Sequence, residues 1–116
     1  MIPQYRAKKM NSNEYVEGCL IKHLDLTYSI EVLGFADNGS YRNSYEIDQS
    51  TLSIHFPDMT DSEGNEIFAS LSEDGKGGDN LSWSYDIGND KIMGLKYDKE
   101  IFNWNYHWWK VIGIQE

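Results

Sequence analysis

The chain has one cysteine, Cys19, among its 116 residues. A disulfide within the chain is therefore excluded, and a thiolate zinc site would need further sulfur ligands. Cys19 lies in the apolar stretch VEGCLI, so we expect a buried and unreactive thiol. His23 follows four residues later, and on a strand that spacing is roughly 13 Å. The spacing disfavours a cysteine–histidine nucleophile.

Basic residues are also scarce. Ten Lys and Arg stand against 19 Asp and Glu, which gives a net charge of −9. Because an acidic surface repels phosphate, we expect no direct nucleic-acid binding, and a basic partner suits the charge better. The chain has no run of 18 apolar residues, and its start lacks the apolar stretch of a signal peptide. The sequence therefore predicts no membrane contact and a cytoplasmic location.

Helical periodicity is almost absent, and Asp48–Leu52 is the stretch compatible with one helical turn. Alternation with a period of two predicts strands instead. In Thr51–Phe56 we expect the face that carries His55 to lie toward solvent. The predicted strands are Tyr15–Lys22, Tyr28–Leu33, Thr51–Phe56, Ile67–Leu71, Leu81–Tyr85 and Ile92–Tyr97.

Turn residues separate these strands, and no linker divides the chain. The glycine-rich segment Asp74–Asp79 reads as a mobile hairpin loop. Aromatic residues make up 14% of the chain, and such side chains favour strands. We therefore expect one mostly β domain over residues 1–116, in which small, strongly bent antiparallel sheets form a barrel-like structure or a packed pair.

The C-terminal segment Ile101–Ile114 is rich in aromatic residues. Alternate positions carry Trp104, Tyr106 and Trp108, and a bend is expected near Asn103–Asn105 or at Trp108–Trp109. On a strand this stripe is most simply a core face. If exposed, it would instead be a surface for a protein partner or a homo-oligomer, because Trp and Tyr dominate interface hot spots. Trp104, Tyr106 and Trp108 are the candidate partner-binding residues.

No pattern of residues predicts catalysis. Seven acids lie between residues 58 and 79, but their spacing does not match a calcium loop, so we interpret the segment as a solvated turn. His23, His55 and His107 are scattered without a metal-binding spacing, and the glycines do not form a phosphate loop. We therefore predict no catalytic residues, no metal and no cofactor, and a protein that is not an enzyme.

A polar turn closed by glycine leads into an apolar strand at Asp61–Phe68, which reads DSEGNEIF. This stretch resembles the D-x-N-G-K-E-I-F phrase of the phage-associated YopX-like family. Lys8 stands where the family usually has Trp, and Ala69–Leu71 replaces its E-G-D. Shorter pieces similar to other family phrases occur in the same order, at Tyr5–Ala7, Glu14–Gly18, Tyr45–Leu52 and Val111–Ile114.

The resemblance implies a divergent member of the family, a β-rich barrel-like fold and a phage or prophage origin in a bacterial host. It carries no catalytic residues. We therefore expect a non-enzymatic accessory protein that acts by protein–protein interaction or self-assembly. One alternative is an acidic mimic of nucleic acid that inhibits a host DNA-binding protein, which requires acids along one elongated face. A weaker alternative is an enzyme, which requires a concave pocket with converging titratable groups.

Overall fold

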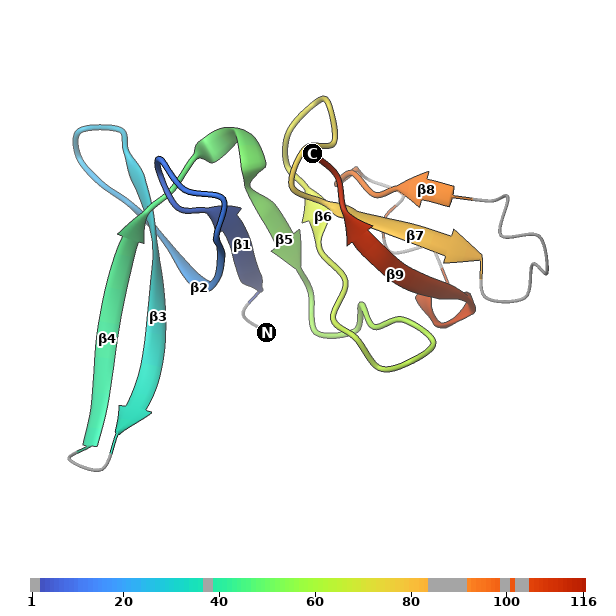
Figure 1. Cartoon of the computed structure of the whole chain (residues 1–116), viewed down its shortest axis with the longest axis horizontal. Helices are drawn as coiled ribbons and strands as arrows, with labels where there is room; N and C mark the ends of the chain where they lie inside the picture. Colours follow the sequence, from blue (N-terminus) through green and yellow to red (C-terminus); the bar gives the residue numbers. More distant parts are fainter. Residues whose placement is uncertain (1–2, 37–38, 84–91, 99–100, 102–104) are drawn as a thin grey trace.

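The computed structural model describes residues 3–36, 39–83, 92–98, 101 and 105–116, and their regular structure is almost entirely β (Figure 1). Two short 3-10 turns, η1 (Gln49–Thr51) and η3 (Tyr106–Trp108), accompany the strands. The described strands are β1 (Gln4–Lys8), β2 (Tyr15–Lys22), β3 (Tyr28–Ala36), β4 (Gly39–Glu46), β5 (Ser53–His55), β6 (Ala69–Ser70), β7 (Asp79–Trp83), β8 (Ile92–Gly94) and β9 (Trp109–Ile114).

The larger sheet has the order β4-β3-β2-β1-β5-β6, and its strand pairs are antiparallel. The first four strands follow one another along the chain. The chain then returns through η1 to place β5 on the other side of β1. Asp48 begins η1, where its carboxylate accepts a hydrogen bond from the backbone N–H of Ser50. The helical turn expected near Asp48–Leu52 is therefore confirmed.

The smaller sheet has the order β8-β7-β9, also antiparallel, with a register shift between Asn80 and Leu81. Backbone contacts join it to the larger sheet at β6. The N–H of Ser70 donates to the carbonyl of Leu95 at 3.1 Å, and the N–H of Tyr97 donates to the carbonyl of Ser70 at 2.8 Å. The two sheets are thus linked through main-chain hydrogen bonds as well as side chains.

Two hydrophobic clusters form the core. One lies on the first strands of the larger sheet, and the other lies between β5, β6 and the smaller sheet. Tyr5 packs against both clusters. The first cluster consists of Ala7, Val16, Ile30, Ile47 and Leu52, and the second of Ile54, Met59, Ile67, Ala69, Leu81, Leu95, Ile101 and Tyr106.

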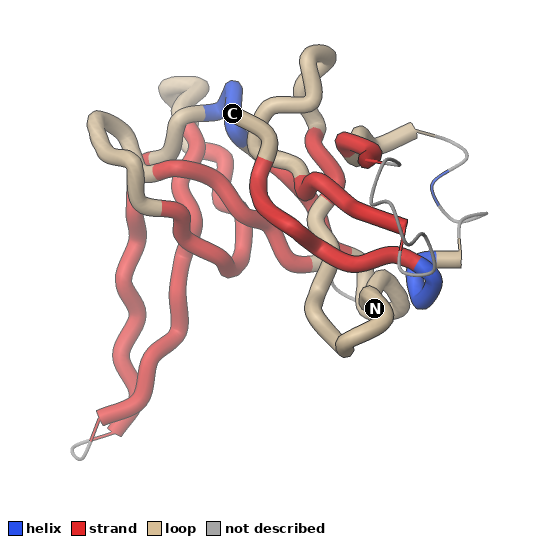
Figure 2. Tube along the Cα trace, turned by 45° about the vertical axis from the view of Figure 1, so that its right-hand side comes forward, coloured by secondary structure: helices blue, strands red, loops and turns tan. Residues whose placement is uncertain are grey.

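The prediction of a mostly β, antiparallel chain is confirmed, but a barrel-like closure is not supported. Both sheets are open, with β4 and β6 at the edges of one and β8 and β9 at the edges of the other. The β3–β4 hairpin extends away from the rest of the molecule in two views (Figures 1 and 2). Among the described residues, no helix is long and apolar enough to span a bilayer.

Two sequence-based expectations about single side chains are wrong. Cys19 is exposed, because β2 turns it to the face opposite the first cluster, where it pairs across from Glu31. His55 is buried rather than solvent-facing, together with Thr51 and Ser53. The reason is that both faces of β5 are covered, since the His55 ring packs against Phe68 and Ile54, on the other face, lies in the second cluster.

Candidate functional site

The three predicted partner-binding residues do not form one exposed stripe. Trp104 lies outside the described residues. Tyr106 is buried in the second cluster, where its hydroxyl donates to the carbonyl of Ile101, and burial raises the pKa of its phenol. Trp108 is 49% exposed. Tyr106 and Trp108 belong to η3, and the strand begins only at Trp109, so the alternation predicted for a single strand does not hold.

Trp108 belongs to a group of three tryptophans. The ring of Trp83 on β7 meets Trp108 edge-on, with centroids 5.6 Å apart and an interplanar angle of 89°. It also meets Trp109 at 5.2 Å and 74°. Such perpendicular contacts match the quadrupoles of the rings and hold them in place. Trp108 therefore keeps one face packed, while about half of the side chain remains available to a partner.

The Asp61 loop (residues 61–65) is held together by hydrogen bonds to the Asp61 carboxylate. The Asp61 carboxylate is buried and accepts hydrogen bonds from the backbone N–H groups of Glu63, Asn65 and Val111, at 2.8–3.0 Å, and from the Asn65 amide. Burial acts to raise the pKa of Asp61, but these donors, led by the Val111 and Asn65 N–H groups, hold it below its usual value. Its oxygens are thus occupied by N–H donors.

The same loop covers the edge of β9. The N–H of Ser62 donates to the carbonyl of Trp109 at 2.8 Å, and Val111 donates to Asp61. Gly64 adopts φ +83°, which the sharp turn requires. The Asp61–Phe68 stretch therefore closes a sheet edge and starts the segment that leads to β6. In the described part of the chain, no three His, Cys, Asp or Glu side chains gather as metal ligands would.

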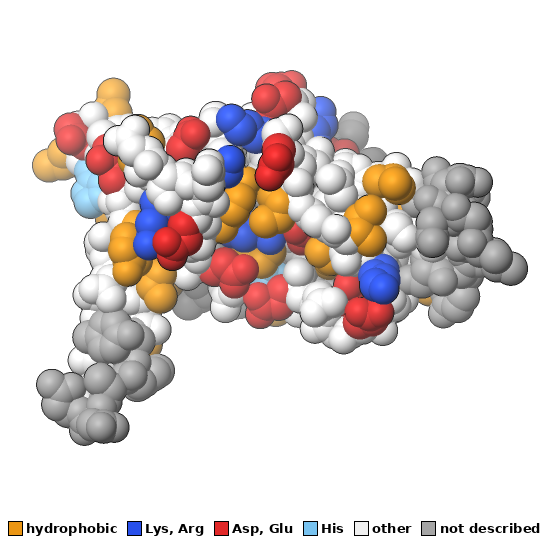
Figure 3. Space-filling model, in the orientation of Figure 1, with side chains coloured by type: hydrophobic (Ala, Val, Ile, Leu, Met, Phe, Trp, Pro, Cys, Tyr) orange, Lys and Arg blue, Asp and Glu red, His pale blue; other side chains and the backbone are white. Residues whose placement is uncertain are grey.

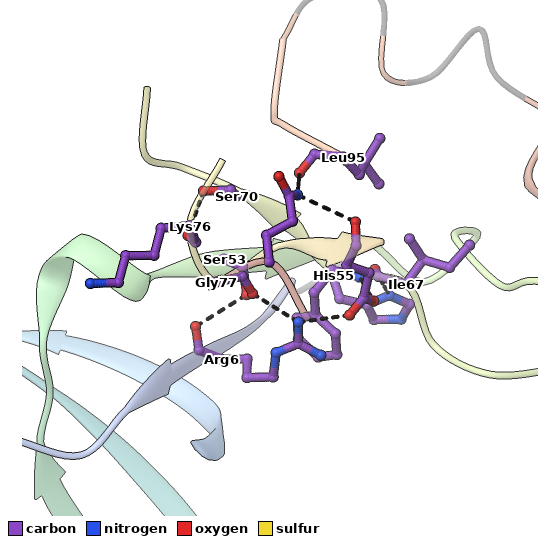
Figure 4. Close-up of polar contacts among 11 residues, drawn as sticks. Arg6, Ser53, His55, Ile67, Ser70, Lys76, Gly77 and Leu95 are labelled. Atoms are coloured by element: carbon purple, nitrogen blue, oxygen red, sulfur yellow. Dashed lines mark hydrogen bonds and ion pairs between the residues drawn. The ribbon is translucent and has the colours of Figure 1, made fainter. Parts of the chain in front are cut away.

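A buried ion pair joins the two sheets. The guanidinium of Arg6 on β1 donates to the Asp79 carboxylate at the start of β7 and to the carbonyl of Gly77, both at 2.8 Å (Figure 4). The second Asp79 oxygen accepts the N–H of Phe68 at 2.8 Å, and the Phe68 ring stacks under the guanidinium at 4.5 Å. Burial raises the pKa of Asp79, and the Arg6 charge opposes that shift.

His55 belongs to the same buried region. Its Nδ1 lies 2.8 Å from the carbonyl of Ile67, and its ring lies 5.3 Å from that of Phe68 (Figure 4). Since a carbonyl can only accept, Nδ1 carries the proton in this contact. We call Arg6, His55, Phe68, Gly77 and Asp79 the junction. Its charged groups face one another and the backbone, which is the arrangement of a cross-link between sheets rather than of a substrate site.

The glycine-rich segment is part of this packing, contrary to the expected mobile loop. Gly75, Gly77 and Gly78 are buried. A Cβ on Gly77 would lie 1.9 Å from the carbonyl oxygen of Thr51, and one on Gly78 would lie 2.4 Å from that of Leu95. Gly77 also has φ +88°. These glycines let backbone segments approach closely, and their sequence alone does not distinguish that role from a flexible turn.

The β2–β3 turn (residues 23–27) is the opposite case, because it presents apolar side chains to solvent. Leu24 is fully exposed and Leu26 is 69% exposed. The turn lies at the left end of the molecule in Figure 1, and hydrophobic atoms stand out at that end in Figure 3. Leu26 also has φ +69°, a left-handed conformation that glycine or asparagine usually supplies.

Hydrogen bonds fix the backbone of this turn. The N–H of His23 donates to the carbonyl of Thr27 at 2.9 Å, and the N–H of Leu26 donates to that of His23 at 3.1 Å. The Asp25 carboxylate accepts both the hydroxyl and the N–H of Thr27, at 2.7 and 3.1 Å. The two leucines are therefore held on a defined backbone rather than on a floppy loop.

Sequence reasoning missed this turn, and one signal in the sequence pointed to it. The segment His23–Thr27 reads HLDLT between two predicted strands, so two leucines occupy positions where turns usually carry polar residues or glycine. The partners Arg6 and Asp79 were missed as well. They lie 73 residues apart, and nothing local to either of them indicates the pairing.

Comparisons with family models, with curated proteins and with solved structures gave no match for this chain. The similarity to the YopX-like family and the phage or prophage origin thus stay predictions.

Proposed function

We propose that the protein is a non-enzymatic accessory protein that binds a protein partner through the β2–β3 turn. The observation that carries this proposal is the exposure of Leu24 and Leu26 on a turn held by internal hydrogen bonds. A left-handed leucine costs on the order of 1–2 kcal/mol relative to a relaxed backbone. The Leu26 side chain therefore stands at a strained position while making little contact within its own chain.

Burial in a partner would use these side chains. Covering a leucine contributes about 1.5–3 kcal/mol, so two leucines on a rigid turn can anchor an interface. Figure 3 shows charged and hydrophobic atoms side by side at this end. The Asp25 and Glu46 carboxylates border the same shallow depression as Leu24. The hydrogen bonds from Thr27 hold the pKa of Asp25 below its usual value, so it is anionic at neutral pH.

The exposed leucines and the neighbouring carboxylates indicate which kind of partner surface would fit the turn. An apolar pocket would receive the leucines, and Lys or Arg side chains around that pocket would face Asp25 and Glu46. The net charge of −9 would speed association with such a basic surface at low salt.

Paired capture experiments on a bacterial lysate test this proposal. The wild type, Leu26→Gly and Leu24→Ser are immobilised, and Met10→Ser is the matched control because Met10 is an exposed apolar side chain on another turn. A protein retained by the wild type and the control, but lost with both leucine variants, supports the proposal once purified and titrated. Equal retention by all four proteins would contradict it.

The nucleic-acid mimic remains the alternative proposal. It requires acids aligned on one elongated face. Asp61 and Asp79 are buried, and Figure 3 shows Asp and Glu interspersed with Lys and Arg over the visible face, a distribution that counts against a mimic. A mimic would bind its target in a salt-sensitive way that Leu26→Gly leaves unchanged. The absence of enzymatic activity and the cytoplasmic location in a bacterial host stay predictions.

A further inference from the structure

The strand β4 forms an edge of the larger sheet, and over most of its length no described residue bonds to its outer side. Among the described strands it pairs with β3 alone, through eight aligned residue pairs. The hydrogen bond from the N–H of Ile47 to the carbonyl of Tyr28 fixes which residues of this ladder bond inward. Alternation along an antiparallel pair then directs the N–H and C=O groups of Ser40, Arg42, Ser44 and Glu46 away from β3.

Part of this outward row already has a partner. The N–H of Met10 donates to the carbonyl of Glu46 at 2.9 Å, as the alternation requires. For Ser40, Arg42 and Ser44, no described residue pairs with the outward backbone groups. The row is regular, without proline, lysine or a bulge in β4. Natural proteins usually protect such an edge, because it is a ready template for another strand.

Two other edges of this molecule, those of β9 and β6, are protected. The Asp61 loop bonds to the edge of β9 at Trp109 and Val111. The two-residue strand β6 is bridged by the segment around Lys96. The contrast within one chain indicates that the β4 edge is left open for a strand.

We propose that this strand is β4 of a second copy, paired antiparallel about a two-fold axis at Tyr41, a register that keeps the second strand clear of Met10 beside Glu46. In this register Ser40 of one copy faces Arg42 of the other, and the reverse, which gives about four backbone hydrogen bonds. The proposal does not depend on the partner proposed for the β2–β3 turn.

Charge and shape both suit a second copy. The Arg42 side chain lies 3.4 Å from the Glu31 carboxylate of its own chain, so two copies would not set bare positive charges against each other. The hairpin extends beyond the body of the molecule (Figures 1 and 2). Antiparallel pairing therefore places the two bodies on opposite sides of the axis, which keeps two chains of charge −9 apart.

Sedimentation equilibrium over a range of protein concentrations tests the association. The wild type should form a dimer with rising concentration, and added salt should strengthen it by screening the repulsion between bodies. Ser40→Pro removes an outward N–H and should shift the protein to monomer while the far-UV circular dichroism stays unchanged. A wild type that is monomeric at about 1 mM, or a Ser40→Pro variant that dimerises equally well, would overturn the proposal.

A cross-link tests the register independently. Across the proposed axis the two Tyr41 residues form a non-hydrogen-bonded pair with Cα atoms about 4.5 Å apart, which suits a disulfide. Tyr41→Cys in a Cys19→Ser background should therefore oxidise quickly to a covalent dimer. The wild type is the control, because Cys19 is exposed on β2, two strands from the edge. Cross-linking no faster than through Cys19 would reject this register.

Discussion

The junction and the outer end, meaning the β2–β3 turn together with β4, treat polar and apolar groups in opposite ways. The junction buries an ion pair whose partners come from different sheets and surrounds it with backbone hydrogen bonds. The outer end exposes two leucines and a row of backbone groups. The junction thus links the two sheets, and the outer end is the region for which we propose contacts with other molecules.

The largest effect should come from Gly77→Ala at the junction. The new Cβ would lie 1.9 Å from the carbonyl oxygen of Thr51, at a φ of +88°. We expect a loss above about 5 kcal/mol, enough to prevent folding of a marginally stable domain. Gly113→Ala is the matched control, because a Cβ added there would meet nothing within 4 Å. Far-UV circular dichroism and urea titration compare the two variants. A folded Gly77→Ala variant would show that the fold does not need the close contact between the backbones of Gly77 and Thr51.

Asp79→Ala should have the next largest effect. It leaves the Arg6 guanidinium buried without its carboxylate, which costs about 3–5 kcal/mol. Glu31→Ala is the control, since it breaks an ion pair whose Arg42 side chain is 75% exposed, and it should cost less than about 1 kcal/mol. Urea denaturation measures both. Equal costs would remove the distinction between the junction and the outer end.

Asp61→Asn should have a moderate effect. An amide places an NH₂ group against N–H donors that now face a carboxylate oxygen, at a cost of about 1–3 kcal/mol near neutral pH. Thermal unfolding of the variant and of Asp58→Asn, an exposed acid in the same segment, measures the difference.

The effect of Asp61 should depend on pH. Because its pKa is lower in the folded state than its usual value of about 3.9, its charge stabilises the fold above that pH. This contribution is lost as the pH falls through the folded-state pKa. The gap in stability between wild type and Asp61→Asn should therefore narrow below about pH 4. A gap that is constant from pH 7 to the acid limit would contradict the role given to the charge.

Leu26→Gly should have the smallest effect on stability. Relief of the left-handed conformation and the greater freedom of glycine in the unfolded chain nearly cancel, so we expect a change within about 1 kcal/mol. Leu26→Ala keeps the backbone strain and serves as the comparison. If either variant lost several kcal/mol in urea denaturation, the leucine would be part of the fold rather than a contact residue.

The sequence predicted strands where apolar alternation was strong, and β2 has the predicted bounds, Tyr15–Lys22. It missed β1 and β4, whose sequences QYRAK and GSYRNSYE carry few apolar residues. Hydrogen bonding to neighbouring strands places these segments in the sheet, and no local pattern encodes that pairing. The burial of His55 also depends on tertiary packing, because Phe68 and the Ile67 carbonyl contact its ring.

The candidate site was less predictable than the fold. Aromatic content drew attention to Trp108, which is half exposed, but also to Tyr106, which is core. Alternation along a strand could not tell the buried Tyr106 from the exposed Trp108, because both lie in η3, before the strand begins at Trp109. The acids between residues 58 and 79 were interpreted as a solvated turn, which is wrong for Asp61 and Asp79, because both carboxylates are buried and bonded to N–H groups.

Amide hydrogen exchange, followed by NMR at several protein concentrations, compares the two regions most directly. The N–H groups of Glu63, Asn65 and Val111, which donate to Asp61, should be protected at every concentration. The outward N–H groups of Ser40 and Arg42 should exchange quickly in dilute protein and become protected as the concentration rises. Rapid exchange of Ser40 and Arg42 at all concentrations would contradict the claim that the outer end of this molecule is a contact surface for a second copy.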